Sequence, residues 1–236
     1  MNQILHVFMA KCYMDKQLIN KAVIPDWLTP VQAGAALTQE RVAQCLDCSG
    51  DNISVKNKNY CELTVLYWIW KNRLHSASIN DGGYYGLFHY RRWLDLDDAD
   101  ISRLARMDVD AVLPYPTIHE PDIREHHERY LKHTDWNAML QALRELSPEY
   151  YAAYETVFSQ EYLYNYNILI AKAAVFRQYC EWLFPILLRV EELSVPKGGE
   201  RADRYIGYIG ENLLTLYFIC HRNDFNIVHT GRKMLI

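Results

Sequence analysis

The feature that most constrains the fold is the alternation of short apolar runs with longer segments of helical periodicity. Apolar or aromatic runs are found at residues 4–10, 81–90, 111–113, 164–170 and 225–228. Helical segments alternate with them, at residues 60–72, 119–146, 173–193 and 203–220. Strands that alternate with helices are typical of an α/β fold with a mostly parallel central sheet flanked by helices. Because no internal repeat or linker interrupts the pattern, we expect a single domain over residues 1–236.

The composition argues against several classes of protein. The chain has 25 Lys and Arg against 29 Asp and Glu, whereas a nucleic-acid-binding module normally has a strongly basic face. A hydrophobic content of 50% argues against a disordered chain. No apolar run approaches the roughly 18 residues that indicate a membrane span, and the N-terminus lacks the basic leader and cleavage site of a signal peptide. We therefore expect a cytoplasmic protein.

The cysteines do not form a complete metal site. Cys45 and Cys48 make one C-x-x-C pair, whereas structural zinc sites usually combine two such pairs. A redox dithiol would follow a strand at the start of a helix, but residues 38–46 are typical of a helix end or a loop. We expect ordinary reduced cysteines.

A histidine-rich stretch is the other candidate for metal binding. His126 and His127 are adjacent and His133 lies six residues further along. These residues do not share the helix face that a zinc site of the H-E-x-x-H type needs. Contact with a polar acceptor, or a plain surface position, fits this spacing better, and we expect no metal site.

Two apolar runs end in residues suited to a ligand site. In open α/β sheets, ligands bind outside the carboxyl ends of the strands. Lys11 follows the first run, and His89, Arg91 and Arg92 end the middle one. Arginine forms bidentate hydrogen bonds with phosphate groups, so these arginines could bind a diphosphate. The alternative is one solvated arginine and one that pairs with the acidic residues at 95–100.

Two further groups of polar residues are candidates. Asp51 and Asn52 lie in a turn, where such side chains bond either their own backbone or the hydroxyl groups of a ribose or a sugar. Arg204 and Glu211 are seven residues apart on the last helix and share a face. With Tyr208 they could form the polar wall of a cleft in which a carboxylate acts as a general base. Ordinary solvent-facing charges are the alternative.

Several segments, in this order along the chain, resemble one known family. The most specific are GDNIS at residues 50–54 and GLFHYRR at residues 86–92, and others lie at 31–37, 59–72, 164–184 and 204–214. Together they resemble a bacterial glycosyltransferase family, long known as a domain of unknown function and found in capsule and O-antigen gene clusters. The activity assigned to that family is galactofuranosyl transfer from UDP-galactofuranose. The resemblance extends from about residue 4 to residue 228.

The resemblance implies a GT-A-like fold. Most GT-A enzymes carry a D-x-D motif at the end of the middle strand, where its carboxylates hold a metal ion against the nucleotide diphosphate. This sequence has arginines there. Because guanidinium groups can neutralise the leaving diphosphate directly, we expect metal-independent transfer, with dependence on Mn²⁺ or Mg²⁺ as the alternative.

The resemblance also implies roles for individual residues. We expect an inverting mechanism, since family members make β-linked galactofuranose from an α-linked donor. Glu211 is the first candidate for the general base, and Asp51 is the second. The expected site residues are Glu211 and Arg91 for catalysis; Lys11, Asp51, Asn52, His89, Arg92, Asn167 and Arg204 for donor binding; and His126, His133 and Tyr208 for acceptor binding.

The implied partners are a UDP-sugar donor and a lipid-linked glycan acceptor in a growing capsular or O-antigen glycan. Peripheral association with the inner face of the membrane is consistent with such an acceptor, although no basic amphipathic helix is evident. Two other functions stay open: a transferase for another UDP-hexose, either retaining or inverting, and a catalytically inactive module that binds sugar nucleotides.

The 18 tyrosines are consistent with a carbohydrate site. Aromatic rings pack against the apolar faces of sugars and of a uracil ring, and phenol hydroxyls bind polar ligands. Eight tyrosines fall beside candidate site residues, namely Tyr60, Tyr84, Tyr85, Tyr90, Tyr164, Tyr166, Tyr205 and Tyr208. We expect some of them to line a cleft and the others to belong to the core.

Overall fold

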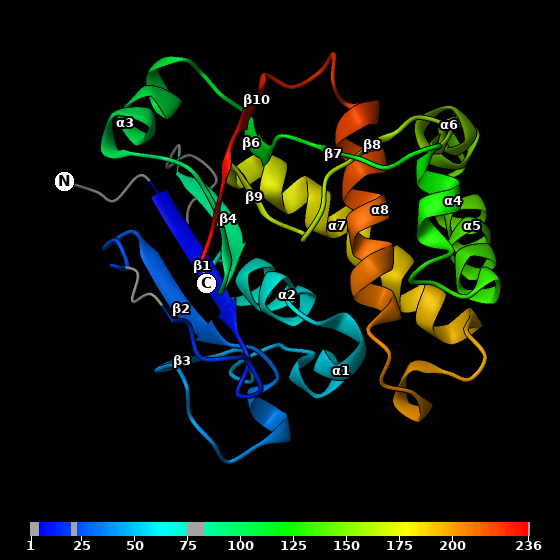
Figure 1. Cartoon of the computed structure of the whole chain (residues 1–236), viewed down its shortest axis with the longest axis horizontal. Coiled ribbons are helices and arrows are strands. Elements are labelled where there is room, and N and C mark those ends of the chain that lie inside the picture. The colour runs from blue at the N-terminus through cyan, green and yellow to red at the C-terminus, as the bar shows by residue number, and fades with distance from the viewer. Residues whose placement is uncertain (1–4, 20–22, 75–82, 236) are drawn as a thin grey trace.

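A nine-stranded sheet forms the centre of the structure, a computed structural model that describes residues 5–19, 23–74 and 83–235 (Figure 1). Its main path has the order β10-β6-β9-β4-β1-β2-β3, and β5 and β11 extend it beside β4. The strands are β1 (Leu5–Lys11), β2 (Leu28–Gln32), β3 (Cys45–Leu46), β4 (Tyr84–His89), β5 (Arg92–Leu94), β6 (Ala111–Pro114), β9 (Leu169–Lys172), β10 (Ile227–Thr230) and β11 (Arg232–Met234).

The main path of this sheet is mostly parallel. β1 pairs in parallel with β2 and β4, β2 with β3, and β6 with β10. β9 lies antiparallel between β4 and β6. Within the described part of the chain, β9 is therefore the one strand of this path that runs against the others. The expected α/β fold class with a mostly parallel central sheet is confirmed.

The central strands are buried on both faces. Phe8 and Ala10 of β1 pack in one hydrophobic core, whereas Val7 and Met9 pack in a second core on the opposite face. Side chains of a strand alternate between the two faces of a sheet. A strand that is covered on both faces is apolar at nearly every position, which explains the apolar run in the sequence that His6 alone interrupts.

A glycine in the middle of β4 permits close strand packing. A Cβ atom added to Gly86 would lie 2.7 Å from Cγ1 of Ile170 and 2.8 Å from the carbonyl oxygen of Leu169. Both contacts are shorter than real Cβ atoms make, and one of them is to backbone. A side chain at this position would therefore force β4 and β9 apart.

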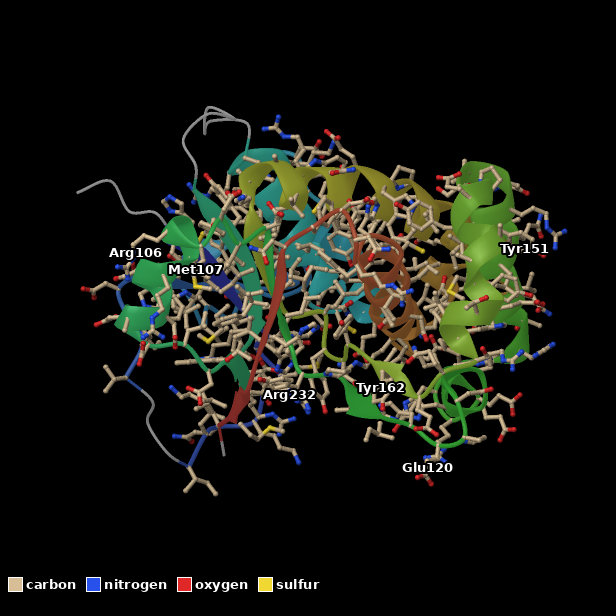
Figure 2. The ribbon with its side chains drawn as sticks, turned by 90° about the horizontal axis from the view of Figure 1, so that it is seen from above. Arg106, Met107, Glu120, Tyr151, Tyr162 and Arg232 are labelled. Atoms are coloured by element: carbon tan, nitrogen blue, oxygen red, sulfur yellow. The ribbon has the colours of Figure 1, made fainter. Side chains whose placement is uncertain are left out.

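The helices form layers around the sheet. They are α1 (Asn57–Tyr60), α2 (Leu63–Asn72), α3 (Asp98–Arg106), α4 (Ile123–His127), α5 (His133–Leu146), α6 (Pro148–Phe158), α7 (Ala173–Leu193) and α8 (Tyr205–Cys220). α2 and α7 contact the sheet directly, and α5, α6 and α8 pack with α7 or with one another. α4, α5, α6 and α8 gather to one side of the sheet (Figure 1). Arg106 of α3 and Tyr151 of α6 mark opposite ends of the molecule (Figure 2).

A second, two-stranded sheet lies outside the main sheet. β7 (Thr117–Ile118) and β8 (Tyr162–Leu163) pair antiparallel although they are distant in sequence.

Among the described residues, no helix is both long enough and apolar enough to cross a bilayer.

The longest helix forms as the sequence predicts. α7 covers the same residues as the helix expected at 173–193. The last helix begins at Tyr205 instead of residue 203, and the segment 119–146 divides into α4 and α5. Residue 4 and residues 81 and 82, which were expected to begin two of the strand segments, lie outside the described residues.

Two local expectations need correction. The segment 38–46 ends in the short strand β3, which pairs with β2. The strand expected at 164–170 begins only at Leu169, because Tyr166 and Asn167 have positive φ angles of 74° and 52°.

A buried ion pair fixes the loop that precedes α8. Nη1 and Nη2 of Arg201 each donate to one carboxylate oxygen of Asp135, at 2.7 Å in both cases. The Asp135 side chain is 0% exposed and that of Arg201 is 6% exposed. Arg201 also pairs with Asp203. This bidentate pair joins α5 to the segment that carries Arg204.

We expect Asp135→Asn to lower the free energy of unfolding by about 3 kcal/mol, because it leaves a buried guanidinium without its main partner. Asp203 still pairs with Arg201 in this variant and so compensates part of its positive charge. Urea unfolding followed by circular dichroism measures the change. Glu145→Gln, which removes a half-exposed partner of Arg189, is the matched control and should have a much smaller effect. Equal effects of the two substitutions would contradict the assignment.

Candidate functional site

A cavity of about 610 Å³ lies where the parallel strands end. Its wall includes residues directly after β1 and β2, the turn that follows β4, and the first turns of α8. The remaining walls come from α1, α4 and the segment before β9. This is the position in which open α/β sheets bind ligands, and the volume is within the roughly 300–1,000 Å³ of small-molecule sites.

Three arginines, together with Lys58, are the cationic side chains that line this cavity. Arg91, Arg92 and Arg204 all line it. Nε of Arg91 and Nε of Arg92 are buried and have no hydrogen-bond partner. The guanidinium of Arg92 stacks on the ring of Tyr166, with 4.0 Å from its carbon to the ring centroid. Buried donors without partners are costly, so the two guanidinium groups are suited to bind an anion.

The third arginine is held by the backbone and by a thiol. Arg204 precedes α8 with a φ of 64°, in the left-handed region. Its Nε donates to Sγ of Cys61 at 3.2 Å. This contact orients the guanidinium toward the wall that α1 and α8 share.

His89 is neutral in this surrounding. Burial, together with the positive charges of Arg92, Arg91 and Arg204, lowers its pKa to about 3. The backbone N–H of Arg91 donates to Nδ1 of His89 at 3.4 Å. A neutral imidazole that accepts at Nδ1 carries its proton on Nε2. His89 therefore offers a neutral hydrogen-bond donor beside the arginines.

Two glutamates line the same cavity. Burial, and then the negative charge of Glu62, raises the pKa of Glu211 to about 8, although the backbone N–H of Tyr166 and the charges of Arg92 and Arg204 oppose the shift. Burial also raises the pKa of Glu62, against a hydrogen bond from Asn167. Carboxyl groups with a pKa near neutrality are suited to general acid or base catalysis.

A third carboxyl group lies at the end of β1. Burial raises the pKa of Asp15 to about 6, although the backbone N–H of Cys12 donates to it at 2.6 Å. Among the described residues, no group of three or more histidine, cysteine, aspartate or glutamate side chains is placed to hold a metal ion.

Two histidines and a tyrosine form another wall. The rings of His119 and His126 lie 3.6 Å apart, and the ring of Tyr130 lies 5.2 Å from His126. Burial and the neighbouring positive groups lower the pKa of His126 to about 4. Nδ1 of His126 has no partner. Tyr130 in turn packs on Tyr208 at 5.2 Å, so this wall reaches α8.

The structure brings together seven of the predicted site residues. The cavity is lined by His89, Arg91, Arg92, His126, Arg204, Tyr208 and Glu211. Lys11 lines a second cavity of about 490 Å³, which shares Cys12, Asp15 and Tyr90 with the first.

The remaining predicted residues do not line the main cavity. Asp51 accepts from Tyr67 at 3.1 Å, and Asn52 donates to the carbonyls of Cys48 and Gly50, so both stabilise their own turn. His133 is exposed at the start of α5. Asn167 is 1% exposed and lies behind the wall, where it contacts Glu62.

Sequence reasoning missed several residues of the site. Asp15, Glu62, His119 and Asn165 also line the cavity. Asp15 follows the first strand and could have been found by the same strand-end rule as Lys11. Glu62 precedes an apolar helix, where a carboxylate is usually a solvated helix-start residue. Nothing in the sequence shows that this one is 8% exposed.

The tyrosines divide between the site and the core. Tyr90, Tyr166 and Tyr208 line the cavity, and Tyr130, which was not foreseen, joins them. Tyr84 instead donates to the backbone carbonyls of Leu104 and Val109 in the core. The other expected tyrosines are not among the residues of this wall: Tyr60, Tyr85, Tyr164 and Tyr205 are buried core residues.

Comparisons with known proteins link the chain to a described family and to a solved glycosyltransferase structure. Residues 19–223 match a family described as "Domain of unknown function (DUF4422)". No curated protein matches the chain. Among solved structures, the chain is similar to the WbbM bifunctional glycosyltransferase in its apo structure, with a TM-score of 0.79 and 25% sequence identity. The similarity covers 98% of this chain and 45% of that chain, so this chain spans less than half of that protein. It confirms the expected α/β fold class.

We expect Arg92→Gln to weaken the binding of inorganic pyrophosphate by roughly tenfold to a hundredfold, because it removes charge-assisted hydrogen bonds. Isothermal titration calorimetry at fixed salt measures the affinity. Arg92→Lys keeps the charge but lacks the planar guanidinium group. Its affinity for pyrophosphate should lie between that of the unchanged protein and that of Arg92→Gln. Arg103→Gln, an exposed position on α3, is the control. Unchanged affinity in Arg92→Gln would show that the anion does not bind at these arginines.

Proposed function

This chain belongs to the DUF4422 family, and we propose that it is an inverting glycosyltransferase that uses a UDP-sugar donor. The observation that carries the proposal is the strand-end cavity, in which the buried Nε atoms of Arg91 and Arg92 have no partner and Glu211 lies among the lining residues. A leaving diphosphate needs cations, and an attacking hydroxyl needs a base. The similarity to a bifunctional glycosyltransferase supports the same class of reaction.

The proposed donor is UDP-galactofuranose, and the proposed acceptor is a lipid-linked glycan of a growing capsular or O-antigen polysaccharide. The resemblance of the motifs at residues 50–54 and 86–92 to a galactofuranosyltransferase family supports the donor. An acceptor of this kind would place the reaction at the cytoplasmic face of the membrane. His126 and Tyr208, which line the cavity together with Tyr130, are the proposed acceptor contacts.

In the proposed reaction, Glu211 removes the proton of the acceptor hydroxyl. The hydroxyl oxygen attacks the anomeric carbon from the side opposite the diphosphate, and the bond from that carbon to the phosphate oxygen breaks. UDP leaves with the electron pair, and the configuration at the anomeric carbon inverts. Arg91, Arg92 and Arg204 stabilise the negative charge that develops on the diphosphate. His89, as a neutral donor, can bind a phosphate oxygen without adding charge.

We propose that transfer does not depend on a metal ion, since guanidinium groups take the place of the metal. The test of the function is a donor screen with UDP-galactofuranose, UDP-galactopyranose and UDP-glucose, each with and without EDTA. Release of UDP from UDP-galactofuranose, with a β-linked product and no loss in EDTA, is expected. An α-linked product would indicate a retaining enzyme. UDP binding without release from any donor would indicate an inactive module.

We expect Glu211→Gln to lower kcat by at least about a hundredfold, which is the lower range for the loss of a general base. The affinity for UDP should stay near that of the unchanged protein, because the amide keeps the size of the side chain. Coupled UDP release and calorimetry measure the two quantities. Glu149→Gln, on the exposed surface of α6, is the control. Retention of most of the activity in Glu211→Gln would remove Glu211 from the mechanism.

The pH dependence of kcat/KM should reflect the protonation state of Glu211. A base works only when unprotonated, and the pKa of Glu211 is raised to about 8. We therefore expect kcat/KM to rise with pH up to about 8 and to fall about tenfold per pH unit well below it. A flat profile between about pH 5 and about pH 8 would contradict this assignment.

A further inference from the structure

The C-terminal strand β11 supports the turn that carries two arginines of the cavity. Met234 of β11 pairs with Arg92 of β5 in an antiparallel ladder. The backbone N–H of Leu235 donates to the carbonyl oxygen of Arg91 at 2.8 Å. On its other side, β5 pairs with β4 through Arg92 and His89. The backbone of this turn is therefore held from both sides, by a neighbouring strand and by a strand that is distant in sequence.

β11 also places a further guanidinium group on the aromatic ring of Tyr166. The guanidinium carbon of Arg232 lies 5.5 Å from the centroid of that ring, and the guanidinium carbon of Arg92 lies 4.0 Å from it (Figure 2 labels Arg232). Both distances are within the roughly 6 Å over which a cation is attracted to an aromatic face. Tyr166 and Arg92 line the cavity, whereas Arg232 is not among the lining residues. One ring thus joins a cation of the wall to a cation outside it.

The turn that carries this ring has a fixed conformation. Tyr166 and Asn167 have φ angles of 74° and 52°, which residues with side chains rarely adopt. Such a conformation persists only where the surrounding structure imposes it. Nδ2 of Asn167 donates to Oε1 of Glu62 at 2.8 Å and to the carbonyl oxygen of Gly207 at 3.1 Å, so the turn is attached to α8 and to the residue before α2. The ring of Tyr166 therefore starts from an anchored backbone.

Hydrogen bonding does not account for the position of Arg232. Its Nη1 is buried and has no hydrogen-bond partner, as is also true of Nε of Arg92. Buried donors without partners are costly, and two guanidinium groups on one ring repel each other. Lys233, the next residue of the strand, instead forms an exposed ion pair with Asp95 at 2.6 Å. The contact with Tyr166 is the interaction that distinguishes Arg232 from its neighbour.

We propose that Arg232 is a positioning residue for the anion site: through the ring of Tyr166, it holds the guanidinium group of Arg92 in the orientation that binds the leaving diphosphate. The contact with Arg232 restricts the ring, and the ring restricts Arg92. A side chain that is already fixed loses less conformational entropy when its ligand binds, so the affinity rises. The role rests on the proposed function only in so far as the anion is the diphosphate of a sugar donor.

The test measures the affinity for inorganic pyrophosphate by isothermal titration calorimetry at fixed salt. Arg232→Gln should weaken binding by roughly threefold to tenfold, because it removes one of the two cations that hold the ring of Tyr166. Arg232→Lys keeps the charge but lacks the planar guanidinium group, and it should weaken binding by a smaller factor. Lys233→Gln removes one positive charge from the same strand and is the matched control, with unchanged affinity expected.

A double-mutant cycle distinguishes positioning from direct contact with the anion. If Arg232 acts through Arg92, then Arg232→Gln should add little to the loss of affinity that Arg92→Gln already causes. An equal loss in both backgrounds would show that Arg232 attracts the anion directly, and would overturn the positioning role. Urea unfolding of each variant verifies that the affinities are those of folded proteins.

An unchanged affinity in Arg232→Gln would overturn the proposal, and so would an unchanged protein that binds no pyrophosphate. If Arg232→Gln does not fold, Arg232→Lys replaces it in the same measurements, and an unchanged affinity there would overturn the role too. The donor screen separates this proposal from the proposed function. The expected loss of pyrophosphate affinity, in a protein that releases UDP from no donor, would refute the proposed function and leave the role of Arg232 intact.

Discussion

The buried carboxylate of Asp47 is the interaction on which the geometry of the site depends. One of its oxygens accepts from the backbone N–H of Gly34 at 2.8 Å and from Oγ1 of Thr64 at 2.7 Å. The other accepts from the backbone N–H of Ala35 at 3.0 Å and from Oγ of Ser54 at 2.5 Å. A carboxylate that is 0% exposed is tolerable only because every lone pair has a donor. Asp47 thereby joins the loop after β2 to the start of α2.

The hydrogen-bond network around Asp47 contributes to the wall of the main cavity. Thr64 follows Glu62 by two residues, so the network around Asp47 also fixes the backbone that carries Glu62. On the other side, the ion pair of Arg201 with Asp135 fixes the segment that leads to Arg204 and α8. Glu62 on one side of the cavity and Arg204 on the other are therefore each adjacent in sequence to a buried polar contact. Neither contact is part of the cavity, and each is needed to define its shape.

The sequence predicts the architecture well and the site in part. The apolar runs that alternate with helical segments identify β1, β4 and β6, because strands covered on both faces are almost entirely apolar. The strand-end rule finds Arg91 and Arg92, since chain order and strand direction are enough to place them. It does not find Glu62 or the role of Asn167, because their meeting depends on the left-handed turn before β9 and on the close packing of α8. Such long-range contacts leave no periodic signal. Of the two roles that the sequence leaves open for Asp51 and Asn52, the structure shows the local one: they stabilise a turn that Asn72 also contacts.

Several residues of the cavity wall are in conformations or surroundings that destabilise the fold. Buried donors without partners, such as Nε of Arg91 and Nε of Arg92, cost about 1–3 kcal/mol each, and the left-handed turn at Tyr166 adds roughly 1–2 kcal/mol. Local rules of sequence and structure fail most often at functional sites, where other parts of the fold compensate. Here the two cores on either side of the sheet supply that compensation. A bound diphosphate would give the guanidinium groups their missing partners, so ligand binding and stability of the site are thermodynamically linked. The cavity is therefore preorganised for an anion: the fold holds the cations in place before the anion arrives, and the anion removes the cost.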